Sequence, residues 1–79
     1  MKNLEKYNAI FREVMQVDDS QLQALNFRDC DNWDSVGFMT LVSSIEEAFD
    51  IELEAEDLLE FNSYIKGKEI LSNVYGIQF

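Results

Sequence analysis

The stretch Trp33-Asp34-Ser35-Val36 stands at the start of the clearest helical pattern in the chain. Asp34 is a residue type that favours a helix N-cap, and its negative charge suits the positive end of the helix dipole. Ser35 then falls in the first helical turn, where backbone N–H groups and the dipole favour an attached phosphate. We therefore predict that Ser35 presents an exposed hydroxyl at a helix N-terminus, in a position suited to a phosphate ester.

Apolar side chains recur at helical spacing after Ser35. The predicted stripe consists of Val36, Met39, Val42, Ile45 and Phe49, with Leu41 beside it. Steps of three and four residues place these side chains on one face of a helix that ends near Asp50. Gly37 is a poor helix former, and it either leaves the approach to Ser35 open or is simply tolerated in the first turn. Glu46 and Glu47 are expected to face outward.

Residues 3–16 are predicted to form the first helix of the chain. Its apolar face consists of Leu4, Tyr7, Ile10, Phe11 and Val14. From residue 18 to residue 34 the helical periodicity lapses, which predicts a long loop, and loops of this length in small domains are often functional. The loop is expected to lie across the core because it still contains large apolar side chains, namely Leu22, Leu25, Phe27 and Trp33.

The segment that follows the central helix is predicted to hold an extended connection and a short helix. Ile51 and Leu53 alternate with two glutamates, as in a strand, but four residues are too few and no partner strand is evident. We expect an extended connection with Ile51 or Leu53 pointing inward. Residues 56–61 then predict one or two helical turns.

The last helix is predicted to begin at Asn62 or Ser63. Its apolar face consists of Tyr64, Gly67, Leu71 and Val74. Gly67 on that face is expected to permit the close approach of another helix. With 79 residues, of which 47% are apolar, the chain has room for one packed domain. We therefore predict an all-α fold and a single domain over residues 1–79.

Acidic residues are concentrated in the middle of the chain. The net charge is −10, and residues 34–60 contain nine acids and no base. Nucleic acid is a poor partner for such a chain because binding it requires clustered Lys and Arg, whereas a basic protein surface is a good partner. No apolar run approaches the ~20 residues of a membrane span, and no signal peptide is evident. We expect a soluble, cytoplasmic and monomeric protein.

The chain lacks the histidine on which Ser-His-Asp and Cys-His catalysis depends. It has no histidine and a single cysteine, Cys30, so a Ser-His-Asp or Cys-His arrangement, an intramolecular disulfide and a thiol-based metal cluster are all excluded. Ser35 has no obvious base to activate it. We therefore predict that Ser35 is an acceptor modified by another enzyme, that the chain has no catalytic residue of its own, and that it is not an enzyme.

The acids Asp29, Asp31 and Asp34 suggest a calcium loop as an alternative, but the sequence does not fit one. An EF-hand loop starting at Asp29 and using Asp31 would need Asp or Asn at its fifth position, Gly at its sixth and Glu at its twelfth. These positions hold Trp33, Asp34 and Thr40 instead. No metal site is predicted.

The stretch Asp34-Ser35-Val36, followed at the right distance by the stretch from Ile45 to Leu53, resembles the acyl carrier proteins. The resemblance extends from Leu4 to about Val74. It implies a four-helix bundle with three longer helices, one short third helix and a long loop between the first two. It also implies that a phosphopantetheinyl transferase attaches 4′-phosphopantetheine from coenzyme A covalently to Ser35, and that the thiol of this arm holds acyl groups as thioesters.

The resemblance also implies that the helix beginning at Ser35 is the surface that partner enzymes recognise. These partners would be the transferase and the acyl-loading and acyl-processing enzymes, with basic docking surfaces. The residues expected to contact them are Asp34, Val36, Thr40, Ser43, Glu46 and Glu47. The acids of the first helix, Glu5 and Glu13, are expected to lie away from this surface.

Several positions depart from the carriers of bulk fatty-acid synthesis. Thr40 stands where those carriers usually have a glutamate, and Ser43 replaces a larger apolar residue. Trp33 and Gly37 resemble a Trp-Asp-Ser-Leu/Val-Gly pattern found in carriers of specialised pathways of the fatty-acid or polyketide type. Carriers of D-alanine also have a glycine two residues after the serine, so an aminoacyl cargo stays open. The other alternative is an unmodified acidic interaction module with the same fold.

The charge pattern leads to a prediction about stability. The nine acids of residues 34–60 should repel one another in the compact state, and added salt screens that repulsion over a Debye length of about 10 Å at 0.1 M. We expect the melting temperature, followed by circular dichroism, to rise with moderate salt or with millimolar divalent cation. A flat or falling melting temperature over that range would show that the acids are too widely spaced to matter.

Overall fold

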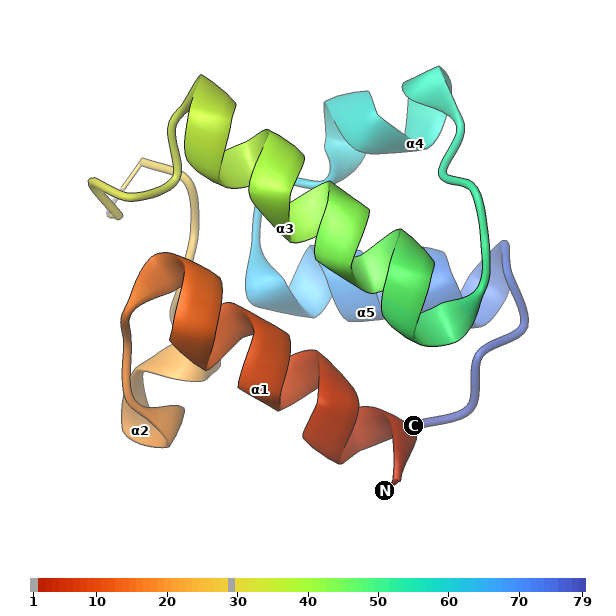
Figure 1. Cartoon of the computed structure of the whole chain (residues 1–79), viewed down its shortest axis with the longest axis horizontal. Helices are drawn as coiled ribbons and strands as arrows, with labels where there is room; N and C mark the ends of the chain where they lie inside the picture. Colours follow the sequence, from red (N-terminus) through yellow and green to blue (C-terminus); the bar gives the residue numbers. More distant parts are fainter. Residues whose placement is uncertain (1, 29) are drawn as a thin grey trace.

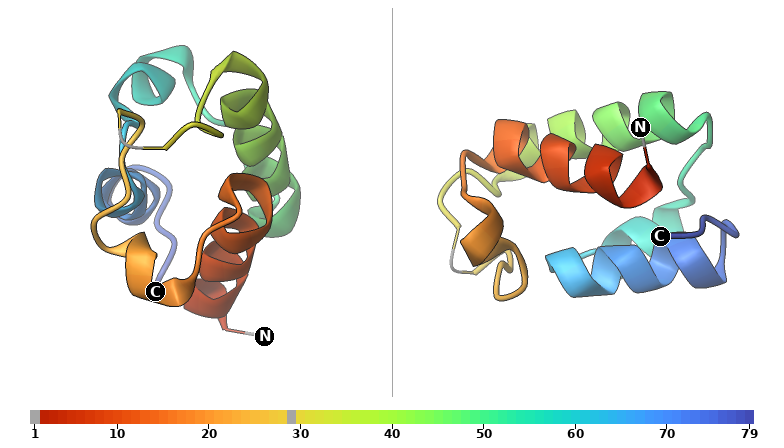
Figure 2. Two further views of the ribbon diagram at one scale, coloured as in Figure 1. Left: turned by 90° about the vertical axis from the view of Figure 1, so that its left-hand side faces the viewer. Right: turned by 90° about the horizontal axis from the view of Figure 1, so that it is seen from below.

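The computed structural model describes residues 2–28 and 30–79, and in these residues it contains five helices and no strand. The helices are α1 (Asn3–Met15), α2 (Asp19–Leu22), α3 (Ser35–Phe49), α4 (Ala55–Glu60) and α5 (Tyr64–Asn73). Figure 1 shows α1 and α3 side by side and running in opposite directions, with α4 on the side of the molecule away from α1. Figure 2 shows α5 on the other side of the core from α1 and α3. The predicted all-α fold is confirmed.

Aromatic rings fill much of the core between these helices. Tyr7 and Phe11 of α1 lie with their ring centroids 5.0 Å and 5.4 Å from that of Tyr64 in α5. Phe61, just after α4, stacks on Phe11 at 6.4 Å. The buried apolar residues are Tyr7, Phe11, Met15, Leu22, Leu25, Trp33, Leu41, Val42, Ile45, Leu53, Phe61, Tyr64, Ile70, Leu71 and Ile77. Every long helix contributes to this set, so the three long helices share one core.

The hydroxyl groups inside the core are paired. Tyr7 Oη donates to the Tyr64 carbonyl oxygen at 2.7 Å, and the Tyr64 hydroxyl donates to the side-chain carbonyl oxygen of Asn8. Burial raises the pKa of Tyr7 far above its ordinary value, so the hydroxyl stays protonated and keeps donating. These bonds link α1 to α5 and avoid the cost of an unpaired buried hydroxyl.

The apolar stripe predicted for α3 is wrong at its N-terminal end. Leu41, Val42 and Ile45 are buried as expected, but Val36 is 76% exposed and Met39 is 57% exposed. A step of three residues falls about 60° short of a full turn, so Val36 and Val42 lie about 120° apart on the helix. Successive apolar residues at three-residue spacing therefore drift off the buried face, and the first two emerge on the surface beside Ser35.

The predicted loop from residue 18 to residue 34 contains the short helix α2. Its first turn is closed by a bond from the Asp18 backbone N–H to the Gln21 side chain, at 2.8 Å. An ion pair of 2.6 Å between Arg12 and Asp19 ties α2 to α1. The loop crosses the core as predicted, with Leu22, Leu25 and Trp33 buried, but the inward placement expected of Phe27 is wrong because its side chain is 44% exposed.

The connection between α3 and α4 is extended, as predicted, and buries Leu53. The Tyr75 hydroxyl secures the start of α4, because it accepts from the Glu54 N–H at 2.8 Å and donates to Asp57 Oδ2 at 2.6 Å. Burial and the bond to Asp57 raise the pKa of Tyr75 above its ordinary value. The C-terminal segment therefore holds α4 in place beside the start of α3.

Gly67 allows α5 to pack against α1 and the end of α4, as the sequence predicted. An added Cβ would lie 2.6 Å from Phe61 Cε1 and in steric overlap with the Tyr7 hydroxyl. Ser63 caps α5 by accepting from the Lys66 N–H at 3.0 Å. The inward placement expected of Val74 is wrong, since it follows the end of α5 and is 58% exposed.

We predict that Gly67→Ala destabilises the fold. Overpacking of this kind typically costs about 1–3 kcal/mol, whereas the better helix propensity of alanine contributes at most ~1 kcal/mol. The midpoint of urea unfolding should therefore fall. Ser72→Ala, at an exposed position of the same helix, is the matched control and should leave the midpoint unchanged or slightly raised. A Gly67→Ala protein as stable as the control would contradict the close packing described for this position.

Candidate functional site

Ser35 is the first residue of α3, and its side chain is exposed. The predicted N-cap, Asp34, is confirmed: its Oδ1 accepts from the Gly37 N–H at 2.8 Å, and its carbonyl oxygen accepts from the Phe38 N–H at 2.8 Å. In the part of the chain that the structure describes, the Ser35 hydroxyl has no hydrogen-bond partner. Since Asp34 caps the helix, the Ser35 hydroxyl is free to carry a substituent.

The backbone just before Ser35 is anchored by Trp33. This side chain is buried, with its ring centroid 5.7 Å from Phe11 of α1 and 6.4 Å from Phe38 of α3, on which it stacks. The Trp33 N–H donates to the Cys30 carbonyl oxygen at 3.0 Å and closes a tight turn. Ser35 is therefore held at the surface by a neighbour only two positions away that is fixed in the core.

The role of Gly37 differs from both roles considered from the sequence. Asn32 lies against the first turn of α3, and its side-chain amide donates to the Met15 carbonyl oxygen at 2.9 Å. The backbone carbonyl oxygen of Asn32 occupies the place that a Cβ at Gly37 would take. Glycine is needed here because the preceding loop passes directly over the helix.

Two surface hollows meet at Ser35. One, of about 550 Å³, lies between the start of α3 and α4 and is lined by Phe27, Arg28, Trp33, Asp34, Ser35, Phe38, Leu58, Leu59, Phe61 and Asn62. The other, of about 620 Å³, runs along α3 and is lined by Ser35, Val36, Met39, Thr40, Ser43, Ser44 and Glu47. We call them the α3–α4 hollow and the α3 hollow. A group attached to Ser35 therefore has open, partly apolar surface on both sides.

The charges near Ser35 suit a phosphate ester. The N-terminal end of α3 carries the positive end of the helix dipole. Arg28 lines the α3–α4 hollow together with Ser35 and adds a positive charge. The nearest acid, Asp34, has one carboxylate oxygen engaged with the Gly37 N–H. The residues present thus fit a phosphodiester on the Ser35 oxygen.

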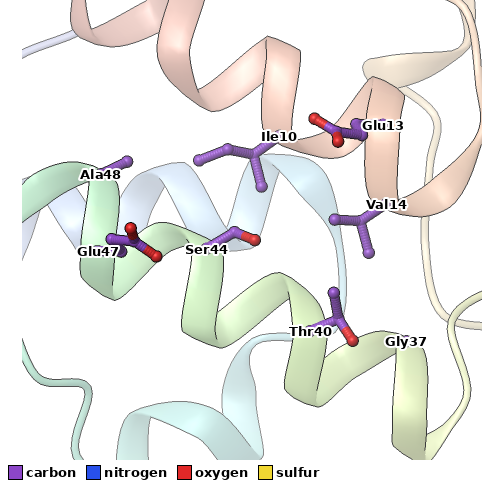
Figure 3. A pocket seen from close by; sticks show the side chains of 8 residues that line it. All are labelled: Ile10, Glu13, Val14, Gly37, Thr40, Ser44, Glu47 and Ala48. Atoms are coloured by element: carbon purple, nitrogen blue, oxygen red, sulfur yellow. The ribbon is translucent and has the colours of Figure 1, made fainter.

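A third depression, the α1–α3 groove, separates the two long antiparallel helices. It measures about 690 Å³, and Figure 3 shows side chains of both helices along it. They are Ile10, Glu13 and Val14 of α1, and Gly37, Thr40, Ser44, Glu47 and Ala48 of α3. It shares Thr40, Ser44 and Glu47 with the α3 hollow, so the two depressions adjoin each other along α3.

Most of the residues predicted to contact partners lie together on this side of α3. Val36, Thr40, Ser43 and Glu47 line the α3 hollow with Ser35, whereas Asp34 lines the α3–α4 hollow. The outward placement expected of Glu46 is wrong. Glu46 is half-buried, and its carboxylate accepts from the Leu53 N–H at 2.8 Å. Its bond holds the connection after α3, and Glu47 is the exposed member of the pair.

Two residues near the site, Glu13 and Arg28, were not predicted from the sequence pattern. Glu13 is expected from the sequence to lie away from the recognition surface, but it lines the α1–α3 groove together with Glu47, because α1 and α3 are antiparallel neighbours. Arg28 was not singled out, although it is the one base close before Trp33 in the sequence. A single base among the acids around Ser35 is a feature of the sequence that could have drawn attention to this position.

Nothing in the described part of the chain indicates a metal site. No group of three or more acidic, cysteine or histidine side chains is placed to hold a metal ion there. Asp29, the first residue of the rejected calcium loop, lies outside the described residues. Among residues 2–28 and 30–79, none of the helices is long and apolar enough to cross a membrane.

Comparison with known proteins identifies the family. The sequence model of the phosphopantetheine attachment site family matches residues 8–65, which is well over half of the chain and includes Ser35. No curated protein and no solved structure matched. Domains of this family carry covalently attached 4′-phosphopantetheine, are generally non-catalytic, and work with phosphopantetheinyl transferases and partner enzymes. The chain belongs to this family of phosphopantetheine carriers.

Proposed function

We propose that Ser35 carries the 4′-phosphopantetheine group and that residues 1–79 form a single acyl carrier domain. The observation that carries the proposal is the position of Ser35: an exposed hydroxyl at the first residue of α3, inside the matched region, with the helix cap supplied by Asp34. The two hollows that meet at Ser35 support the same assignment, because they leave room for an attached arm.

The attachment reaction follows from the chemistry of the hydroxyl. The Ser35 oxygen forms a new bond to the phosphorus atom that bears the pantetheine arm, and the pyrophosphate bond of coenzyme A breaks. Adenosine 3′,5′-bisphosphate leaves, and the hydroxyl proton passes to a base of the transferase. The base comes from the transferase because this chain has no histidine and the neighbouring Asp34 caps α3.

The chain itself contributes position and recognition. When bound, the arm supplies a thiol that holds acyl groups as thioesters. Exposed apolar side chains lie close to Ser35, with Val36 and Met39 in the α3 hollow and Phe27 and Leu59 in the α3–α4 hollow. With the acids of α3 they provide a contact surface for the transferase and for acyl-loading and acyl-processing enzymes with basic surfaces.

We place this carrier in a specialised biosynthetic pathway of the fatty-acid or polyketide type, as a monomer in the cytoplasm. The departures at Thr40 and Ser43 from the pattern of bulk fatty-acid carriers support the pathway, and mutual repulsion at a net charge of −10 supports the monomer. Gly37 had also suggested a D-alanyl or other aminoacyl carrier. Its contact with the Asn32 carbonyl accounts for the glycine, so Gly37 carries no information on cargo.

We predict that Ser35→Ala abolishes attachment and leaves the fold intact. Because Asp34 is the cap, loss of the Ser35 hydroxyl should cost the helix little. Intact mass after treatment with coenzyme A and a broad-specificity transferase reports attachment, and circular dichroism reports the fold. Full loading of the variant at another serine, such as Ser43 or Ser44, would overturn the assignment. A wild-type chain that gains no mass would favour the unmodified interaction module.

We also predict that Gly37→Ala slows attachment. The added methyl group must displace the Asn32 carbonyl and with it the turn that places Ser35. Small-to-large changes in a packed position cost about 1–3 kcal/mol, so the melting temperature should fall as well. The rate of mass gain and a thermal melt measure the two effects. A variant that is more stable than the wild type and loads at the same rate would show that the turn yields freely to the methyl group.

A further inference from the structure

We propose that the α1–α3 groove receives a basic side chain of the phosphopantetheinyl transferase, with Glu13 and Glu47 as its docking residues. The inference rests on the proposed function, and it extends the docking surface from α3 to α1. It assigns a docking role to Glu13, which is expected from the sequence to lie away from the partner surface.

The lining of the groove matches the two parts of a lysine or arginine side chain. Half-buried apolar side chains, Ile10, Val14 and Ala48, form its apolar part. Figure 3 shows Glu13 on the α1 side and Glu47 on the α3 side of this apolar part. Lysine and arginine bury their aliphatic stems on apolar surface while the charged group stays near water. One such side chain can therefore cover the apolar residues and place its charged group beside one of the two carboxylates.

Both carboxylates are available for a partner. Glu13 and Glu47 are exposed, and within residues 2–28 and 30–79 neither forms an ion pair or a hydrogen bond. Arg12, next to Glu13 in the sequence, is engaged with Asp19. Two unpaired acids along one groove make the groove electronegative, and a cation placed in it is attracted by both. The charge complementarity therefore points to a basic occupant.

The position of the groove points to the transferase. The groove begins at Gly37, two residues after Ser35, and Ser44 at its middle lies about 14 Å from Ser35 along the helix axis. A standard interface buries roughly 800 Å² on each partner, which corresponds to a patch with a radius of about 16 Å. An enzyme centred on the Ser35 hydroxyl therefore covers much of the groove while it works.

The first test removes the charges and keeps the shape. We expect Glu13→Gln and Glu47→Gln each to raise the KM of a basic, broad-specificity transferase for this chain by about two- to fivefold, with kcat changed less than twofold. The loss should disappear in about 0.5 M salt, where exposed charges are screened. The matched control is Glu5→Gln combined with Glu52→Gln, two exposed acids outside the groove, which gives the same net charge as the Glu13/Glu47 double variant.

A second variant tests the shape of the groove independently of its charge. Ala48→Gln adds a longer neutral side chain at the end of the groove and leaves every carboxylate in place. If a side chain of the transferase enters the groove, Ala48→Gln raises the KM even though the net charge is unchanged. If only the overall negative field attracts the enzyme, Ala48→Gln has the KM of the wild type, and this result would overturn the proposal.

A binding measurement keeps the inference separate from the attachment assignment. In the Ser35→Ala chain no attachment at residue 35 can occur, so amide shifts on addition of the transferase report docking alone. We expect the amides of Gly37, Ser44 and Ala48 to shift, and the shifts to be lost in the Glu13→Gln/Glu47→Gln variant. Unloaded wild-type chain with intact docking would defeat only the proposed function. Equal effects of the groove and control variants would defeat the docking proposal. Groove shifts that appear with rising concentration of the chain alone, without the transferase, would defeat it as well.

Discussion

The burial of Trp33 is the interaction on which the position of Ser35 depends. Its ring makes an edge contact with Phe11 of α1 and stacks on Phe38 of α3, so it joins the loop to both helices. Burial of a large aromatic side chain contributes on the order of 3 kcal/mol, more than any single exposed contact near the site. Once Trp33 is fixed, Asn32 must lie on Gly37 and Asp34 falls at the helix cap. The exposed position of the Ser35 hydroxyl therefore depends on the burial of the Trp33 ring.

The sequence was most informative where structure is decided by near neighbours. The start of α3 was predictable because an aspartate before a helical pattern caps the helix through its own backbone, and Asp34 does so. The prediction fails for Val36 and Met39 because each three-residue step falls about 60° short of a full turn, so residues at this spacing move around the helix and off its buried face. The reason for Gly37 was not predictable, since it depends on the carbonyl of a loop residue five positions earlier.

Glu46 and Glu47 show the same limit for charged residues. They are adjacent and chemically identical, yet the Glu46 carboxylate binds the Leu53 N–H and Glu47 has no partner among the described residues. The difference arises because Asp50 adopts a left-handed conformation, with φ 54°, and the chain turns back along α3 after it. A helical pattern specifies which side chains share a face, but it does not specify which loop returns to meet them. The same holds for Glu13, which reaches the site through the antiparallel pairing of two helices.

The exposed apolar side chains and acids near Ser35 suit a small molecule that serves several enzymes in turn. Its interior is filled by aromatic packing, and the Tyr7 hydroxyl within it is hydrogen-bonded. Exposed Val36 and Met39, and unpaired acids such as Glu13 and Glu47, lie on the surface near Ser35. Each exposed ion pair contributes only about 0.2–1 kcal/mol, and together such pairs accelerate encounter more than they delay release. Weak contacts spread around a rigidly held hydroxyl therefore suit a carrier that must find each enzyme quickly and leave it soon after.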